Sequence, residues 1–229
     1  MNRSQETVSA IIVAAGDSKR MGGIDKVFAP LGKRPVLARV IDVFEKCPSV
    51  HNIAIVVSRQ SLENASRLVA EQKYIKIAGI CPGGERRQDS VYAGLGKLAP
   101  CDWVIVHDGA RPLVTAELIE RGLEEVKETG AAVAAVPVID TIKLSGDDML
   151  VQGTLPRNNL WAVQTPQVFR YSIITDAYRH MKYEVTDDAT LVERAGYQVK
   201  LFMGAYENIK ITNQEDLAIA EVLVKKYGR

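Results

Sequence analysis

The sequence of 229 residues is short of cysteine, of net charge and of long apolar runs. Its three cysteines, Cys47, Cys81 and Cys101, form no CxxC pair, so neither a disulfide framework nor a zinc site is expected. Its 29 basic and 28 acidic residues nearly cancel, which argues against a general nucleic-acid or anionic-membrane binder. No apolar run approaches the roughly 18–20 residues of a membrane span, and residues 1–9 include no apolar signal segment. We therefore expect a cytoplasmic protein with no nucleic-acid and no membrane partner.

The chain alternates short runs rich in Val, Ile and Ala with longer amphipathic runs, and no repeat or Ser/Gly linker interrupts it. The short runs are apolar on successive residues and predict strands covered on both faces, over residues 8–15, 52–58, 75–80, 103–107, 131–138 and 199–203. The longer runs predict helices, over residues 35–46, 61–73, 89–98, 115–129, 171–182, 187–195 and 214–227. This order predicts an α/β, Rossmann-like fold: a mainly parallel sheet with helices on both faces, and ligand crevices at the carboxyl ends of the strands.

The alternation breaks after Val138. Residues 139–159 hold a short apolar stretch, a turn at residues 145–148 and a second extended stretch that ends at Pro156, which is typical of a projecting β-hairpin. We expect a single domain over residues 1–229, with an arm at about residues 139–160. Because such an arm lacks the apolar area for a core of its own, a partner subunit is the simplest surface for it to pack on.

A glycine-punctuated loop, residues 14–22 with the sequence AAGDSKRMG, follows the first strand directly. Small residues allow backbone N–H groups to approach an anion, and the guanidinium of Arg20 suits phosphate oxygens. The spacing of Gly16 and Gly22 fits neither GxGxxG nor the P-loop, which disfavours NAD dehydrogenases and P-loop ATPases. Lys26 follows ten residues after Gly16 and is placed to reach the same phosphates.

A second polar cluster, HDGARP at residues 107–112, ends an apolar strand. In a parallel sheet this is the ligand end, so Asp108 is expected beside the first loop, where its carboxylate can hold Mg²⁺ together with substrate phosphates. His107 is a tempting metal ligand, but a lone histidine at a strand end is more often packed and hydrogen-bonded.

Eight ordered motifs carry a resemblance that spans essentially the whole chain. Besides residues 14–22, Lys26 and HDGARP, they are GGERRQDSV at residues 83–91, VPVIDTIK at 136–143, WAVQTPQVF at 161–169, TDDAT at 186–190 and NIKIT at 208–212. The chain closely resembles the 2-C-methyl-D-erythritol 4-phosphate cytidylyltransferase family. The resemblance implies a homodimeric nucleotidyltransferase of the non-mevalonate isoprenoid route, which uses CTP and Mg²⁺ and releases pyrophosphate.

The resemblance also assigns roles to matching positions. It places Arg20 and Lys26 among the contacts to the nucleotide and Lys210 among those to the sugar phosphate. As catalytic residues we hypothesise Arg20 and Lys26, which would brace the triphosphate, and Lys210, which would stabilise the attacked α-phosphorus. Contacts to the nucleotide fall on Ala14, Ala15, Gly16, Gly84, Glu85, Ser90, Asp108 and Gly109, with Asp108 also the metal ligand. Contacts to the sugar phosphate fall on Arg111, Thr141, Arg157, Thr165 and Thr186, of which Thr141 and Arg157 lie on the arm that in the family reaches across the dimer.

The chemistry of phosphate groups agrees with the lack of an obvious histidine or serine catalytic constellation. A phosphate monoester with a second pKa near 6 is largely dianionic at pH 7, so as a nucleophile it needs no general base. Three alternatives remain open: a cytidylyltransferase for another polyol phosphate such as ribitol 5-phosphate, a non-catalytic nucleotide-binding module, and a dinucleotide oxidoreductase. Acceptor profiling would test the first alternative, and a lack of pyrophosphate release would favour the second. Binding of NADH would favour the third.

Overall fold

The computed structural model describes residues 6–16, 25–181 and 183–227. Within these residues a seven-stranded sheet runs in the order β11-β7-β10-β6-β1-β4-β5. All neighbouring strands are parallel except β10, which is antiparallel to both β6 and β7. The strands are β1 (Val8–Ala14), β4 (Asn52–Val57), β5 (Ile77–Pro82), β6 (Trp103–Asp108), β7 (Ala131–Pro137), β10 (Trp161–Arg170) and β11 (Lys200–Met203).

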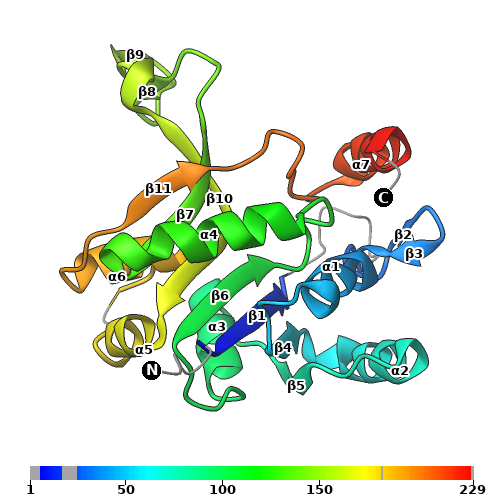
Figure 1. Ribbon diagram of the computed structural model, residues 1–229. Coiled ribbons are helices and arrows are strands. Elements are labelled where there is room, and N and C mark those ends of the chain that lie inside the picture. The colour runs from blue at the N-terminus through cyan, green and yellow to red at the C-terminus, as the bar shows by residue number, and fades with distance from the viewer. Residues whose placement is uncertain (1–5, 17–24, 182, 228–229) are drawn as a thin grey trace.

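Helices cover both faces of this sheet, as the sequence predicts (Figure 1). One face carries α1 (Val36–Lys46), α2 (Leu62–Gln72) and α4 (Ala116–Thr129), and the other carries α3 (Arg87–Leu95), α5 (Tyr171–Arg179) and α6 (Asp188–Arg194). The last helix, α7 (Gln214–Tyr227), packs in a third cluster beside a short hairpin of β2 (Pro30–Leu31) and β3 (Arg34–Pro35). Two short 3-10 turns are η2 (Arg59–Ser61) and η3 (Arg157–Asn159).

The alternation of apolar side chains explains this layering. In β1, Ile12 packs into the core under α1, α2 and α4, whereas Ile11 packs under α3, α5 and α6, and both are fully buried. A strand covered on both faces needs apolar side chains at odd and even positions alike. The helix α4 begins where the Thr115 hydroxyl accepts a hydrogen bond from the Leu118 N–H, and it ends at Gly130, whose φ of 81° suits glycine.

The Rossmann-like fold is therefore confirmed, but several predicted boundaries were wrong. Strand β5 lies two residues later than predicted, with Ile75 left 88% exposed, and α3 spans residues 87–95 instead of 89–98. Strand β10 was not predicted at all, although it lies inside the sheet between β6 and β7. Among the described residues, none of the helices combines the length and the apolar character needed to cross a membrane.

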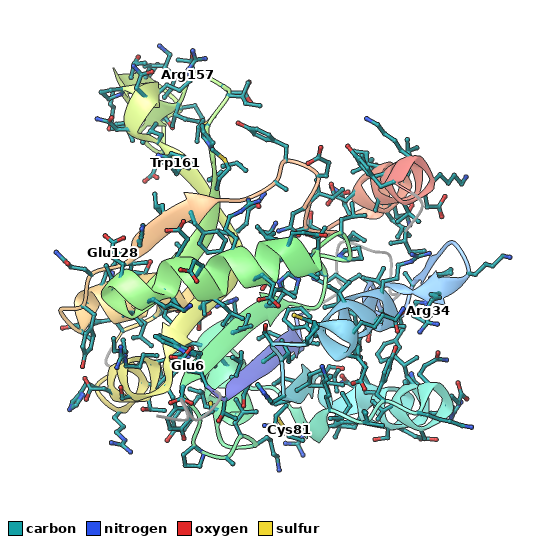
Figure 2. All side chains as sticks on the ribbon, viewed as in Figure 1. Glu6, Arg34, Cys81, Glu128, Arg157 and Trp161 are labelled. Atoms are coloured by element: carbon teal, nitrogen blue, oxygen red, sulfur yellow. The ribbon has the colours of Figure 1, made fainter. Side chains whose placement is uncertain are left out.

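The predicted arm contains a hairpin of β8 (Lys143–Ser145) and β9 (Val151–Thr154), paired antiparallel. It stands away from the sheet at the top of Figure 1. Figure 2 places Arg157 on this arm and Trp161 nearer to the sheet. Large apolar side chains on the arm are exposed, among them Met149 at 80% and Leu150 at 67%.

Candidate active site

The loops after β1 and β5 and the end of β6 meet at the carboxyl edge of the sheet. In the sheet register Val13 lies beside Asp108, and Ala14 lies beside Val57. Together with the start of α3, these segments enclose a cavity of about 470 Å³, here named the first cavity. Its walls include nine of the residues assigned by motif: Ala14, Ala15, Gly16, Lys26, Gly84, Glu85, Ser90, Asp108 and Lys210. Gly109 is the exception, because it is buried behind the wall, where its N–H donates to the Val13 carbonyl.

The small residues of GGERRQDSV allow α3 to approach β1 closely. A Cβ atom on Gly83 would lie 2.3 Å from Ala15 Cβ and 2.5 Å from Ser90 Oγ. Both distances are too short for non-bonded atoms, so any larger residue at this position would force the loop to move. The Ser90 hydroxyl accepts from the Gly84 N–H at 3.2 Å. The loop after β5 is thus packed between the loop after β1 and the first turn of α3. Gly84, Arg87 and Ser90 from this loop and helix line the cavity, and a small-residue loop before a helix N-terminus suits an anion.

A second cavity of about 360 Å³ adjoins the first. The two share Arg87, Asp108 and Lys210 as wall residues. Three of the residues assigned by motif to the sugar phosphate, Arg111, Thr165 and Thr186, line this second cavity. The structure therefore brings the two halves of the predicted site together around Asp108.

Three cations surround the Asp108 carboxylate, whose side chain is 8% exposed. Lys210 Nζ lies 2.8 Å from Oδ2, Arg111 Nε lies 3.4 Å from Oδ2, and Arg87 Nε lies 3.4 Å from Oδ1. Burial by itself would raise the pKa of Asp108, but the charges of Arg87, Lys210 and Arg111 outweigh it and hold this pKa well below its ordinary value. Asp108 is therefore an anion at neutral pH, and it contacts three cations.

His107 lies behind this cluster and lines neither cavity. Burial lowers its pKa to about 4, so the ring is neutral at pH 7. Its Nε2 lies 3.2 Å from the Arg111 carbonyl, which can only accept, so Nδ1 accepts from the Thr165 hydroxyl at 3.0 Å. That hydroxyl in turn accepts from the Asp108 N–H at 3.0 Å. His107 thus has the packed, hydrogen-bonded environment that the sequence favoured.

The two residues predicted on the arm lie apart from these cavities in this chain. Thr141 lines neither of them, and Arg157 lines a separate hollow beside Pro137, where its Nη1 donates to the Ile139 carbonyl at 2.7 Å. Figure 2 shows Arg157 far out on the arm. Arg20, the remaining catalytic prediction, lies outside the described residues.

Two residues of the candidate site were missed by the sequence reasoning. Arg87 lines both cavities and contacts Asp108. Asn208 is fully buried, and its side-chain amide donates to the Thr165 backbone carbonyl at 2.8 Å. The backbone carbonyl of Asn208 accepts a hydrogen bond from Arg111 Nη1 at 2.7 Å. Both lie inside motifs on which the resemblance rests, Arg87 in GGERRQDSV and Asn208 in NIKIT. A charged or amide side chain within such a motif was the sequence feature that could have indicated a place in the site.

Comparison with known proteins decides the family. The family described as 2-C-methyl-D-erythritol 4-phosphate cytidylyltransferase (IspD) matches residues 8–226. The chain belongs to this family. A protein of Dehalococcoides mccartyi strain 195 that carries the family's name is 54% identical over 221 residues, 96% of this chain and 97% of that protein. Another from Alkaliphilus oremlandii is 45% identical over 223 residues, 95% and 94% of the two chains.

Solved structures of the cytidylyltransferase family share the fold. The crystal structure of the 4-diphosphocytidyl-2C-methyl-D-erythritol synthase from Anaerococcus prevotii matches with a TM-score of 0.85 at 31% identity, and covers 96% of this chain and 97% of that one. The family enzyme from Thermus thermophilus matches with a TM-score of 0.77 at 30% identity, over 94% and 98% of the two chains. As a member of the family, the protein is a nucleotidyltransferase that transfers a cytidylyl group to 2-C-methyl-D-erythritol 4-phosphate.

Proposed function

We propose that CTP binds in the first cavity and that the phosphate of 2-C-methyl-D-erythritol 4-phosphate binds in the second, in a step of the non-mevalonate route to isoprenoid precursors. The observation that carries this proposal is the pair of cavities that meet at Asp108, with Lys210 and Arg87 on the shared wall. The first cavity combines small residues with a helix N-terminus, which suits a nucleotide phosphate. The second is lined by Arg111 and Thr186 together with the shared Arg87 and Lys210, cations that suit a phosphate monoester.

The transfer itself follows from this placement. An oxygen of the acceptor phosphate forms a bond to the α-phosphorus of CTP, the bond from that phosphorus to the bridging oxygen breaks, and the electron pair leaves with pyrophosphate. Because the acceptor is largely dianionic at pH 7, no proton has to be removed. The neutral, buried His107 is not needed as a base. Positioning and fixed charge therefore account for the rate.

We assign each cationic side chain to a phosphate group of CTP from the cavity that the side chain lines. Lys26 is 9% exposed and lines the first cavity, and a Cβ atom on Gly16 would lie 3.5 Å from its Nζ. We assign Lys26, together with Arg20, to the triphosphate. Lys210 lines both cavities, so it is assigned to the α-phosphate, where nucleophile and leaving group meet. Charge stabilisation of this kind contributes about 10²–10³ in rate per group.

Asp108 is also the proposed Mg²⁺ ligand. In the described part of the chain no group of three or more His, Cys, Asp or Glu side chains is placed to hold a metal ion. One carboxylate still fits the chemistry, because Mg²⁺ is commonly held by one or two carboxylates and by substrate phosphates. When bound, the ion would neutralise charge on the phosphates. An Asp108→Asn variant should need more Mg²⁺ for half-maximal activity, and an unchanged magnesium titration would remove Asp108 from this role.

We further propose a homodimer formed through the arm. Exposed apolar side chains on the arm and on the adjoining strands support this, because a partner subunit would remove them from water. They include Ile139, Leu144, Met149, Leu150, Val151, Val163, Leu201 and Met203. In such a dimer Thr141 and Arg157 would act in the partner's second cavity. A cytoplasmic location is also proposed, which the free thiols Cys47, Cys81 and Cys101 support.

The test is release of pyrophosphate from each nucleoside triphosphate, with methylerythritol phosphate or ribitol 5-phosphate as the acceptor. We expect release with CTP and methylerythritol phosphate, and much less with every other pair. Preference for ribitol 5-phosphate would favour the alternative acceptor, because the two activities share the nucleotide half of the site. CTP binding without any release would favour the non-catalytic module.

A further inference from the structure

Arg87 bridges two carboxylates that belong to different parts of the fold. It is the first residue of α3, and it lines both cavities. Its Nη1 donates to Asp188 Oδ2 at 2.6 Å, and its Nε donates to Asp108 Oδ1 at 3.4 Å. One guanidinium therefore connects the end of β6 with the first turn of α6. The shorter of the two contacts, to Asp188, fixes where the guanidinium stands.

Asp188 is itself held tightly. Its side chain is 1% exposed, and its second oxygen, Oδ1, accepts from the Tyr178 hydroxyl at 2.6 Å. Neither Asp188 nor Tyr178 lines either cavity, so their contacts serve Arg87 and the packing around it. Next to Arg87, Gln88 bonds to the Tyr183 carbonyl and the Val185 N–H, which ties the same turn of α3 to the segment before α6.

We propose that Arg87 is a positioning residue for cytidylyl transfer, held by Asp188 and Tyr178 so that it fixes the Asp108 carboxylate between the two cavities. This inference rests on the proposed roles of the cavities and of Asp108. It assigns a function to a hydrogen-bonded chain, Tyr178–Asp188–Arg87–Asp108, of which only the last member was predicted from the sequence. A loss of Asp188 should then act on the reaction through Arg87.

A double-mutant cycle tests this dependence. Arg87→Gln should lower kcat about 10- to 100-fold, the effect of losing charge-assisted hydrogen bonds, with the Kd for CTP nearly unchanged. Asp188→Asn should lower kcat about 10-fold. If Asp188 acts through Arg87, the double variant should match Arg87→Gln alone within about 2-fold. Additive losses, or wild-type kcat in Arg87→Gln, would overturn the proposal.

Further variants separate positioning from folding. Tyr178→Phe keeps the ring and should lower kcat about 3-fold through Asp188. Tyr197→Phe is the matched control, because it removes a comparable 2.9 Å bond to Asp176 outside both cavities, and its kcat should stay at the wild-type value. Equal losses in the two Tyr variants would contradict the positioning role.

Binding measurements by calorimetry complete the test. If the Kd for CTP rises in Arg87→Gln by as much as kcat falls, Arg87 binds the nucleotide itself and the proposal is overturned. Lys in place of Arg87 keeps the charge but not the two-pronged geometry, so Arg87→Lys should recover only part of kcat. Wild-type enzyme that released no pyrophosphate from CTP and methylerythritol phosphate would overturn the proposed function, whereas an active wild type with an unaffected Arg87→Gln would overturn only the positioning role.

Discussion

Replacement of Asp108 by asparagine should cost much of the stability of the fold. The carboxylate is 8% exposed and faces three cations within 3.4 Å. Removal of one partner from a buried ion pair costs about 3–5 kcal/mol. We expect the lower end, about 3 kcal/mol, because Arg87 keeps its contact with Asp188 and Arg111 keeps its bond to the Asn208 carbonyl. For a chain of this size that loss lowers Tm by about 6–12 °C.

The pH dependence of this loss has a defined sign. The folded-state pKa of Asp108 is lowered, because the nearby cations outweigh the opposing effect of burial. Its contribution to stability is therefore fully present above the unfolded pKa of about 3.9, and it declines as pH falls below that value towards the folded pKa. The difference in unfolding free energy between wild type and Asp108→Asn should be constant between about pH 5 and 8 and should shrink below about pH 4.

Thermal and urea unfolding followed by circular dichroism measure this difference. The control is Asp147→Asn, which makes the same chemical change at an exposed position on the arm and should leave Tm unchanged. Equal Tm values for wild type and Asp108→Asn at pH 7 would refute the reasoning. So would a difference that grows as the solution is made more acidic.

Three further predictions concern activity and nucleotide binding. Lys26→Ala and Lys210→Ala should each lower kcat by about 10²–10³, measured as pyrophosphate release, and near-normal turnover would contradict their assignment to the phosphates. Arg157→Ala subunits mixed with Lys26→Ala subunits should regain activity if Arg157 works across the dimer; demonstrated heterodimers without recovery would argue against a shared site. Gly83→Ala should weaken CTP binding about 10-fold, since the added Cβ would lie 2.3 Å from Ala15 Cβ and push the loop away. An unchanged Kd for CTP in calorimetry would contradict this, because the loop would then accommodate the methyl group without loss of binding.

Fold elements differ in how well the sequence predicts them. β1 and β6 were predicted because both are apolar on successive residues and therefore covered on both faces. β10 was missed because its middle carries Gln164, Thr165 and Gln167, and because Pro166 argues against an inner strand. The structure explains the exception: the pairing with β7 shifts register between Val163 and Gln167, and Gln164, Thr165 and Gln167 line the second cavity. The polar residues that conceal the strand are the ones that line this cavity.

Residues of the candidate site also differ in whether the sequence could place them. Asp108 and Ala14 could be placed together because both end parallel strands, and such ends share an edge of the sheet. Arg87 could not be placed, because its role depends on a contact with Asp188, 101 residues away, and no local pattern reports that distance. In the proposed homodimer Thr141 and Arg157 would act in the partner's site, and the sequence of one chain cannot position a second chain.

A carboxylate in the centre of a site for two polyanions first looks unfavourable, because its charge repels phosphate. Its partners explain it: without Asp108, nothing would offset the mutual repulsion of Arg87, Arg111 and Lys210, although Arg87 and Arg111 would keep their contacts with Asp188 and the Asn208 carbonyl. Groups that are already oriented before the reaction contribute most to the rate, since they need no reorganisation during it. Asp108 should therefore govern stability as well as activity. Lys210, 38% exposed at the rim of this cluster, should govern activity more than stability: Lys210→Met should lose kcat, and its Tm should fall by less than that of Asp108→Asn, because Arg87 and Arg111 still face the carboxylate.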